Sequence, residues 1–207
     1  MSFEDHQDLL GHRSGQITTH YSAGRPRACG WAGQHTGSLT ALRDDNPVVF
    51  LHHYLLTLEH GEVPDGEHVV PFGKAEVRRS GGDVTIVATG WMVGRALAAA
   101  EKLAKEGIQA EVIDPRTVAP LDLETILKSV AKTGRLVLVD QAPRHATVGG
   151  IIAADVAEYG FSSLKAPIVQ VNARDTTVPY SEPLEAYVIP DDERIIAGVR
   201  TVLKGRR

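Results

Sequence analysis

The pattern of hydrophobic and polar positions changes near residue 73. From there to the C-terminus, short runs rich in β-branched residues alternate with segments whose apolar residues recur every three or four positions. The short runs predict strands at 83–88, 110–113, 136–139 and 168–171. They lack the in–out alternation of a half-exposed strand, which is typical of a parallel sheet covered on both faces.

The helical segments carry signals for their ends. A helix is predicted over 91–106, and Gly107 follows it where a left-handed residue often ends a helix. Asp122 can cap a second helix, which Gly134 would end. The other two helices are predicted over 148–159 and 191–204. Right-handed crossovers between these elements predict a three-layer α/β/α domain with a mostly parallel sheet over residues 73–207.

The residues before this domain show no sustained periodicity. Glycine interrupts residues 1–39 every few positions, which predicts a loop-rich segment with one short strand near 16–21. A continuous apolar run predicts a buried strand at 47–52. We therefore expect a loop-rich part at 1–60, a linker rich in glycine and proline at 61–72, and the α/β/α domain at 73–207.

Composition and charge narrow the class of protein. Of the 207 residues, 43% are hydrophobic and 23% are charged, as in ordinary globular domains. The formal net charge of −4 argues against a nucleic-acid surface spread over the protein. Cys29 is the only cysteine, and neither a long apolar span nor a signal-peptide core occurs. We expect a cytoplasmic protein that binds neither nucleic acid nor a membrane.

Few motifs carry recognisable chemistry. The sequence contains no dinucleotide-binding, P-loop, nucleophile-elbow or Cys-x-x-Cys signature. His35 lies in a polar loop, where its ordinary pKa suits proton transfer near neutral pH, although a lone loop histidine is usually a surface residue. Four further histidines match no closed set of metal ligands and are interpreted as solvated loop residues. They are His52, His53, His60 and His68.

Six blocks of sequence together carry a family resemblance. The most specific is Ile-Asp-Pro-Arg-Thr-Val-Ala-Pro-Leu-Asp at 113–122. The others lie at 41–50, 61–64, 73–75, 83–88 and 178–181. In this order they resemble the β subunits of thiamine-diphosphate-dependent 2-oxo acid and acetoin dehydrogenases. The resemblance implies a transketolase-like C-terminal domain, which in this family packs against other subunits and docks the lipoyl acyltransferase core.

The resemblance also implies a cofactor shared between subunits. In the family, the N-terminal domain of the β subunit holds the aminopyrimidine of thiamine diphosphate, and the α subunit holds the diphosphate and Mg²⁺. The cofactor acts as an electron sink during oxidative decarboxylation. Residues 33–39 resemble the family's loop Ala-Gln-His-Ser-Gln-Ser-Leu. The resemblance implies that the family's catalytic histidine corresponds to His35.

A second site implied by the resemblance is a cation-binding turn. Related β subunits hold a structural potassium ion in an equivalent turn, and its ligands would map onto Ala41, Leu42, Asp44 and Asn46. Oxygen donors suit a hard cation. The alternative is a polar turn that Asp44 and Asn46 cap without any ion.

The sequence departs from the family before residue 41. Glu4 is the only glutamate among residues 1–34, so the family's glutamate that contacts the aminopyrimidine has no matching counterpart. Family members also insert a strand and a helix where this chain passes directly from Leu39 to Thr40. We therefore expect residues 1–60 to be a shortened remnant of the pyrimidine-binding domain, and the chain alone to be inactive.

Three functions follow from these observations. The first is the C-terminal part of a dehydrogenase β subunit that acts with an α subunit on a 2-oxo acid or acetoin and passes the acyl group to a lipoyl group. The second is a non-catalytic assembly module that forms a homodimer or binds the acyltransferase core. The third is another branch of the transketolase-like superfamily or a nucleotide binder, in which Arg116 and the pair Gly149–Gly150 contact phosphate.

Overall fold

The computed structural model describes residues 40–58 and 70–205. The chain divides into two compact units, Met1–Phe72 and Gly73–Arg207. The short strand predicted near 16–21 lies outside the described residues, and so does His35.

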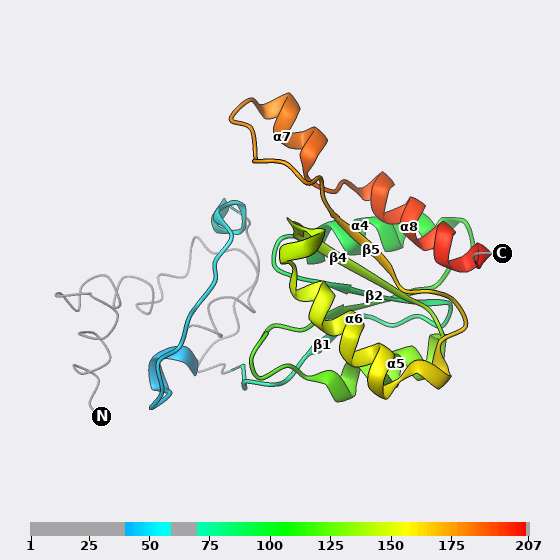
Figure 1. Ribbon diagram of the computed structural model, residues 1–207, viewed down its shortest axis with the longest axis horizontal. Coiled ribbons are helices and arrows are strands. Elements are labelled where there is room, and N and C mark those ends of the chain that lie inside the picture. The colour runs from blue at the N-terminus through cyan, green and yellow to red at the C-terminus, as the bar shows by residue number, and fades with distance from the viewer. Residues whose placement is uncertain (1–39, 59–69, 206–207) are drawn as a thin grey trace. The chain divides into compact units, whose positions relative to one another are not determined.

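A five-stranded sheet forms the centre of the second unit (Figure 1). Its strands are β1 (Glu76–Arg79), β2 (Val84–Ala88), β3 (Ala110–Asp114), β4 (Leu136–Pro143) and β5 (Val169–Ala173), in the order β1-β3-β2-β4-β5. The strands β3, β2, β4 and β5 are parallel, and β1 runs antiparallel to β3 at one edge. Every residue of β2 is buried, which explains why its sequence shows no alternation.

Helices cover both faces of this sheet (Figure 1). They are α4 (Met92–Lys105), α5 (Leu123–Thr133), α6 (Val148–Tyr159) and α8 (Asp192–Lys204). A Cβ built on Gly198 of α8 would meet Val137, whereas one built on Gly149 of α6 would meet Leu138. Consecutive strand residues point to opposite faces, so α8 and α6 lie on opposite sides of β4. This arrangement confirms the predicted α/β/α fold with its mostly parallel sheet.

The helix ends follow the sequence signals. The Asp122 carboxylate accepts a hydrogen bond from the Thr125 N–H (3.1 Å) at the start of α5, and Gly134 ends that helix at φ 72°. Gly107, directly after α4, has φ 82°. These are the residues from which the sequence predicted the two boundaries, because capping is a local interaction.

The core on the α5–α6 side joins both helices to the sheet. It consists of large apolar side chains that are almost completely buried. They are Val87, Ile113, Ile126, Val130, Leu136, Leu138, Ile152 and Val156. A contiguous cluster of this kind supplies most of the hydrophobic stabilisation of a domain.

The first unit contradicts one prediction. Residues 40–43 are helical and the 3₁₀ helix η1 spans Tyr54–Leu58, but residues 47–53 have no regular structure. The strand predicted at 47–52 is therefore wrong. Val49 and Leu51 are 83% and 80% exposed. A buried strand needs neighbouring strands and covering layers, and no strand pairs with this run among the described residues.

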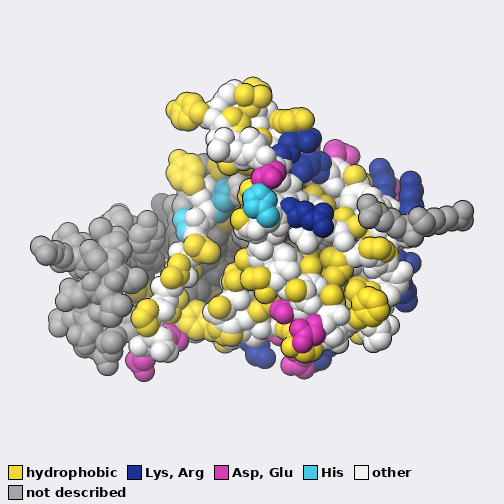
Figure 2. Space-filling model, in the orientation of Figure 1, with side chains coloured by type: hydrophobic (Ala, Val, Ile, Leu, Met, Phe, Trp, Pro, Cys, Tyr) yellow, Lys and Arg dark blue, Asp and Glu magenta, His cyan; other side chains and the backbone are white. Residues whose placement is uncertain are grey.

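The sequence also missed two elements of the second unit. Strand β1 is short and charged and lies at the sheet edge, so it lacks the apolar run of the inner strands. The helix α7 (Glu182–Val188) buries only Val188. Its exposed Leu184 and Tyr187 are part of a group of hydrophobic side chains on the projecting end of the unit (Figure 2). Apolar periodicity cannot predict a helix that has almost no buried face.

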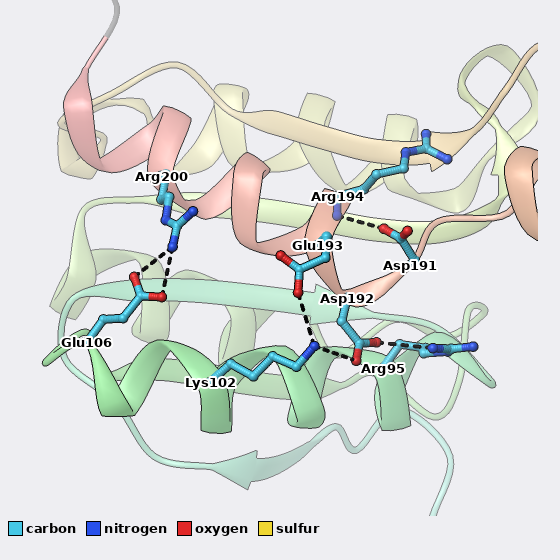
Figure 3. A network of polar contacts seen from close by, with 8 residues as sticks. All are labelled: Arg95, Lys102, Glu106, Asp191, Asp192, Glu193, Arg194 and Arg200. Carbon is cyan, nitrogen blue, oxygen red and sulfur yellow. Dashed lines mark hydrogen bonds and ion pairs between the residues drawn. The ribbon is translucent and has the colours of Figure 1, made fainter.

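Ion pairs link α8 to α4 across one face of the sheet (Figure 3). Lys102 of α4 contacts Asp192 (3.4 Å) and Glu193 (3.1 Å), and Arg200 of α8 binds Glu106 through contacts of 2.8 and 2.9 Å. Asp192 also lies 3.3 Å from Arg95. Asp192 and Glu193 stand at the positive N-terminal end of α8, where the helix dipole favours them.

Candidate functional site

The loop between β3 and α5 is bound to the beginning of the second unit. The Gly73 N–H donates to the Thr117 hydroxyl oxygen (2.9 Å), and that hydroxyl donates to the Pro120 carbonyl (2.8 Å). Gly73 has φ 67°, and a Cβ at this position would lie 3.2 Å from the Pro120 ring. Glycine is therefore required where the chain enters the domain.

Asp122 adds a second tie at the same place. Its carboxylate accepts hydrogen bonds from the Ala75 N–H (3.0 Å) and from the N–H and hydroxyl of Thr125 (3.1 and 2.8 Å). Burial tends to raise the pKa of Asp122, but these hydrogen bonds outweigh it and hold the pKa below its ordinary value. One side chain thus joins the domain entry to the start of α5.

Arg116 has a left-handed backbone, with φ 58°. Asp114 stabilises the turn by accepting a hydrogen bond from the Arg116 N–H (3.0 Å), and the guanidinium forms an ion pair with Glu76 of β1. Glu76 also accepts from Arg78 (2.9 Å). A left-handed residue with a Cβ costs roughly 1–2 kcal/mol, so these contacts must offset that strain. We call Gly73, Glu76, Arg116, Thr117 and Asp122 the entry clasp.

Within the entry clasp, the opposite charges of Glu76 and Arg116 neutralise each other. Burial tends to raise the pKa of Glu76, but hydrogen bonding to Arg78 and the charge of Arg116 hold it below its ordinary value. Burial raises the pKa of Asp114 despite the hydrogen bond from Arg116. The guanidinium of Arg116 is engaged by Glu76, so this arrangement is suited to fixing the domain entry rather than to acid–base chemistry.

The turn predicted to bind potassium is built around Asp44. One oxygen of this carboxylate accepts hydrogen bonds from the backbone N–H (2.8 Å) and the side-chain amide (2.9 Å) of Asn46. Ala41 and Leu42 belong to the preceding helical residues, 40–43. This geometry is a capped polar turn, and the potassium site stays a prediction.

The two groups considered as phosphate contacts have partners within the chain. Arg116 is paired with Glu76. At the start of α6, the Gly149 N–H donates to the Thr147 hydroxyl oxygen (3.0 Å) and the Gly150 N–H to the Thr147 carbonyl (3.1 Å). These N–H groups complete the helix cap, so the described residues give the phosphate hypothesis no support.

Comparison with known proteins identifies the family to which this domain belongs. The sequence profile described as "Transketolase, C-terminal domain" matches residues 73–195, more than half of the chain. The chain belongs to this transketolase C-terminal domain family. The matched region begins at Gly73, the residue at which the second unit and the entry clasp begin.

Curated relatives extend the match into the first unit. The chain is 48% identical over 167 residues to the β subunit of acetoin:2,6-dichlorophenolindophenol oxidoreductase of Cupriavidus necator, covering 81% of this chain and 49% of the relative. It is 41% identical over 167 residues to the pyruvate dehydrogenase E1 component β subunit of Bacillus subtilis, covering 80% of this chain and 51% of the relative. The chain thus spans about half the length of these relatives.

A solved structure agrees with the fold. The chain matches "Split gene transketolase, inactive beta4 tetramer" with a TM-score of 0.63 and 29% identity, covering 73% of this chain and 49% of that one. Family membership and this likeness confirm the predicted resemblance to transketolase-like β subunits.

The described part of this transketolase C-terminal domain protein contains no candidate metal centre. Within residues 40–58 and 70–205, no three histidine, cysteine, aspartate or glutamate side chains gather as they would around a metal ion. His53 instead accepts a hydrogen bond from the Leu55 N–H (3.2 Å) at the start of η1. None of the helices in the same residues is long and apolar enough to cross a membrane.

Proposed function

We propose that the chain is the C-terminal portion of the β subunit of a cytoplasmic thiamine-diphosphate-dependent dehydrogenase, acting on a 2-oxo acid or on acetoin. It works with an α subunit that holds the diphosphate and Mg²⁺, forms a homodimer within the assembly, and delivers the acyl group to a lipoyl acyltransferase core. The observation that carries this proposal is the family match over 73–195, together with 48% identity to an acetoin oxidoreductase β subunit.

Reconstitution with a cognate α subunit tests the proposal. We expect the two chains to copurify and to bind thiamine diphosphate in the presence of Mg²⁺, measured by calorimetry. Reduction of dichlorophenolindophenol with acetoin or pyruvate then reports catalysis. Failure to copurify would overturn the proposal. Copurification without cofactor binding or dye reduction would leave a scaffold that needs residues from outside this chain.

His35 is the catalytic residue of this proposal. Its support is the resemblance of residues 33–39 to the histidine loop of the family. In the reconstituted enzyme, His35→Gln should lower kcat for lipoyl acylation while leaving copurification with the α subunit unchanged. The matched control is His52→Gln, since His52 is exposed in the described part of the first unit. Equal activity of the two variants would remove His35 from the proposal.

The potassium site is a separate part of the proposal. If Ala41, Leu42, Asp44 and Asn46 supply its ligands, potassium should raise the Tm of the chain relative to the same concentration of sodium. Asp44→Asn keeps an acceptor for the turn but removes the negative charge, so it should abolish the potassium-specific shift. Equal Tm values in the two salts would leave the capped turn as the whole function of these residues.

A non-catalytic assembly module is the second candidate function. One observation favours it: a solved relative with a similar fold is described as "Split gene transketolase, inactive beta4 tetramer". In this case the chain should bind its partners without turnover. Addition of a complete β subunit would then restore activity to the α subunit, whereas the chain alone would not.

A further inference from the structure

Residues 73–80 attach the beginning of the second unit to one edge of its sheet, and we call them the entry strap. They contain β1, which is the last strand at that edge and pairs only with β3 among the described residues. The pairing is irregular, because a register shift interrupts it between Val77 and Arg79. An edge strand has no second neighbour to hold it, so it separates from a sheet more easily than an inner strand does.

Little apolar surface holds the entry strap in place. Its only apolar side chains are Ala75, which packs against the core on the α5–α6 side, and Val77, which is 42% exposed. By contrast, every residue of β2 is buried. Arg79 also has a buried Nε to which the described residues offer no hydrogen-bond partner, and opening of the strap would return this group to water. Few buried apolar contacts are typical of a segment that opens locally.

Polar contacts to the loop between β3 and α5 hold the strap instead. Two of them are the hydrogen bonds from the Gly73 N–H to Thr117 (2.9 Å) and from the Ala75 N–H to Asp122 (3.0 Å). The third is the ion pair of Glu76 with Arg116, whose left-handed backbone is costly for a residue with a Cβ. The ion pair helps to hold Arg116 in that conformation, so the closed strap and the strained turn depend on each other.

The chain directly after the strap is fixed to the domain. The Gly81 N–H lies 3.3 Å from the Glu111 carboxylate, and a Cβ built on Gly81 would lie only 2.3 Å from a backbone atom of β3. The next two N–H groups, of Gly82 and Asp83, both donate to the Gln109 carbonyl (3.0 and 2.9 Å). This close packing gives an opening of the strap a definite end at residue 81.

We propose that the entry strap is a releasable connection between the two units. Residues 73–80 separate from β3 as one segment while the four parallel strands stay folded, and the Glu76–Arg116 ion pair holds the closed form. Strand β3 keeps its pairing with β2 in the open form, so the sheet and its covering helices are retained. Opening moves the attachment point of the first unit from residue 73 to residue 81, which gives that unit up to about 25 Å of additional reach. This inference does not depend on the proposed function.

Native-state hydrogen exchange of the full-length chain tests for this opening. The protection of the Ala75 N–H and of the β1 amides bonded to β3 should be at least about tenfold lower than that of the β2 amides. At low urea concentrations the exchange of the strap should stay constant, because a local opening exposes little surface, whereas that of β2 should accelerate. Equal protection and equal urea dependence for β1 and β2 would mean that the strap opens only when the whole unit unfolds, and would overturn the inference.

Glu76→Gln tests the role of the ion pair. It nearly keeps the size of the side chain but removes its charge, and should lower the protection of the strap and of the Arg116 N–H by about threefold or more, with β2 unchanged. The matched control is Glu106→Gln, which breaks the ion pair with Arg200 between α4 and α8; the Glu106 side chain is 43% exposed, against 35% for Glu76. This control should leave the strap as protected as in the wild type. Unchanged protection of the strap in Glu76→Gln, or an equal loss in β2, would overturn the inference.

Trypsin provides a second measurement, since Arg78 and Arg79 lie within the strap. Cleavage there requires the open form and releases a fragment that begins at residue 79 or 80, which mass spectrometry identifies. Its rate follows the population of the open form when opening is fast relative to cleavage. Each rate is divided by that of a peptide of residues 70–85 with the same substitution. Glu76→Gln should then raise the rate by the factor by which it lowers protection, and Glu106→Gln should not change it. Cleavage within α4 or α5 as early as in the strap would overturn the inference.

Discussion

Two short apolar runs of this chain differ in secondary structure and in burial. Residues 136–139 form the first half of β4 and are at most 2% exposed. Residues 48–51 have a comparable composition, yet they adopt no regular structure, and Val49 and Leu51 are largely exposed. The difference lies in the neighbours, because β4 pairs with β2 on one side and β5 on the other. An apolar run predicts a strand only where the rest of the fold supplies both partners and covering helices.

The largest effect should come from placing the same charge in each run. Leu138→Asp puts a carboxylate into the core between β4 and α6, and should destabilise the second unit by at least about 4 kcal/mol or prevent it from folding. Leu51→Asp should change stability by no more than about 0.5 kcal/mol, because Leu51 is 80% exposed. Urea unfolding followed by circular dichroism measures both. Comparable losses in the two variants would mean that residues 48–51 are also buried in solution.

A smaller effect is expected where burial involves polar groups. The hydroxyl of Thr85 in β2 is completely buried and lies 2.7 Å from the Ser129 hydroxyl and 2.8 Å from that of Thr133. Thr85→Val keeps the shape but leaves two buried hydroxyls with one partner fewer, at a cost of about 1–3 kcal/mol. Thr177→Val, at an exposed position, is the control and should be near neutral. An unchanged urea midpoint for Thr85→Val would argue that the network adds no stability.

Asp122 of the entry clasp and Asp114, which binds the Arg116 N–H of the clasp, have pKa shifts of opposite sign. The pKa of Asp122 is lowered in the folded chain, so Asp122 stabilises the fold above the usual aspartate range and loses this effect as pH falls below about 4. Asp122→Asn should cost about 1 kcal/mol at pH 7 and flatten the acid limb of the stability curve.

Asp114 should respond in the opposite direction. Burial raises its folded pKa, so its contribution is present at low pH and is lost as pH rises through that pKa. Asp114→Asn keeps an acceptor for the Arg116 N–H and removes the buried charge, and should leave stability at pH 7 unchanged or slightly higher. Thermal unfolding between pH 3 and pH 8, values chosen to span the aspartate range, compares the two variants. A loss at pH 7 for Asp114→Asn would contradict the direction of its shift.

Sequence reasoning predicted features that depend on residues close together in the sequence, and it missed features that depend on residues far apart. The ends of α5 were predictable because Asp122 and Gly134 act within one helical turn. The left-handed conformation of Arg116 was not, because its ion pair with Glu76 spans 40 residues of sequence. Glu76 itself was missed because β1 is a charged edge strand. The only signal that could have indicated it was an acidic residue directly after the Gly-Lys-Ala block that opens the domain.

Less of the candidate site than of the fold could be predicted from the sequence. The family resemblance predicted the domain and its fold, since the blocks at 83–88 and 113–122 belong to the buried sheet and the clasp. His35 was identified by resemblance alone, with no local pattern that separates a catalytic from a surface histidine. The turn at Asp44 and Asn46 was open between an ion and a cap, because hydrogen bonds within two residues satisfy the same oxygen that a cation would bind.

The smallest effect should come from the exposed ion pairs between α4 and α8. Lys102 remains 47% exposed while it contacts Asp192 and Glu193, so water and salt screen these contacts. Lys102→Met keeps most of the side-chain volume and should destabilise the unit by less than about 0.5 kcal/mol at low ionic strength. The effect should vanish in about 1 M NaCl, where charges are screened within a few ångströms. A loss as large as that of Thr85→Val would mean that the surface network between α4 and α8 rivals the buried hydroxyls, and that exposure alone does not decide which contacts hold this domain together.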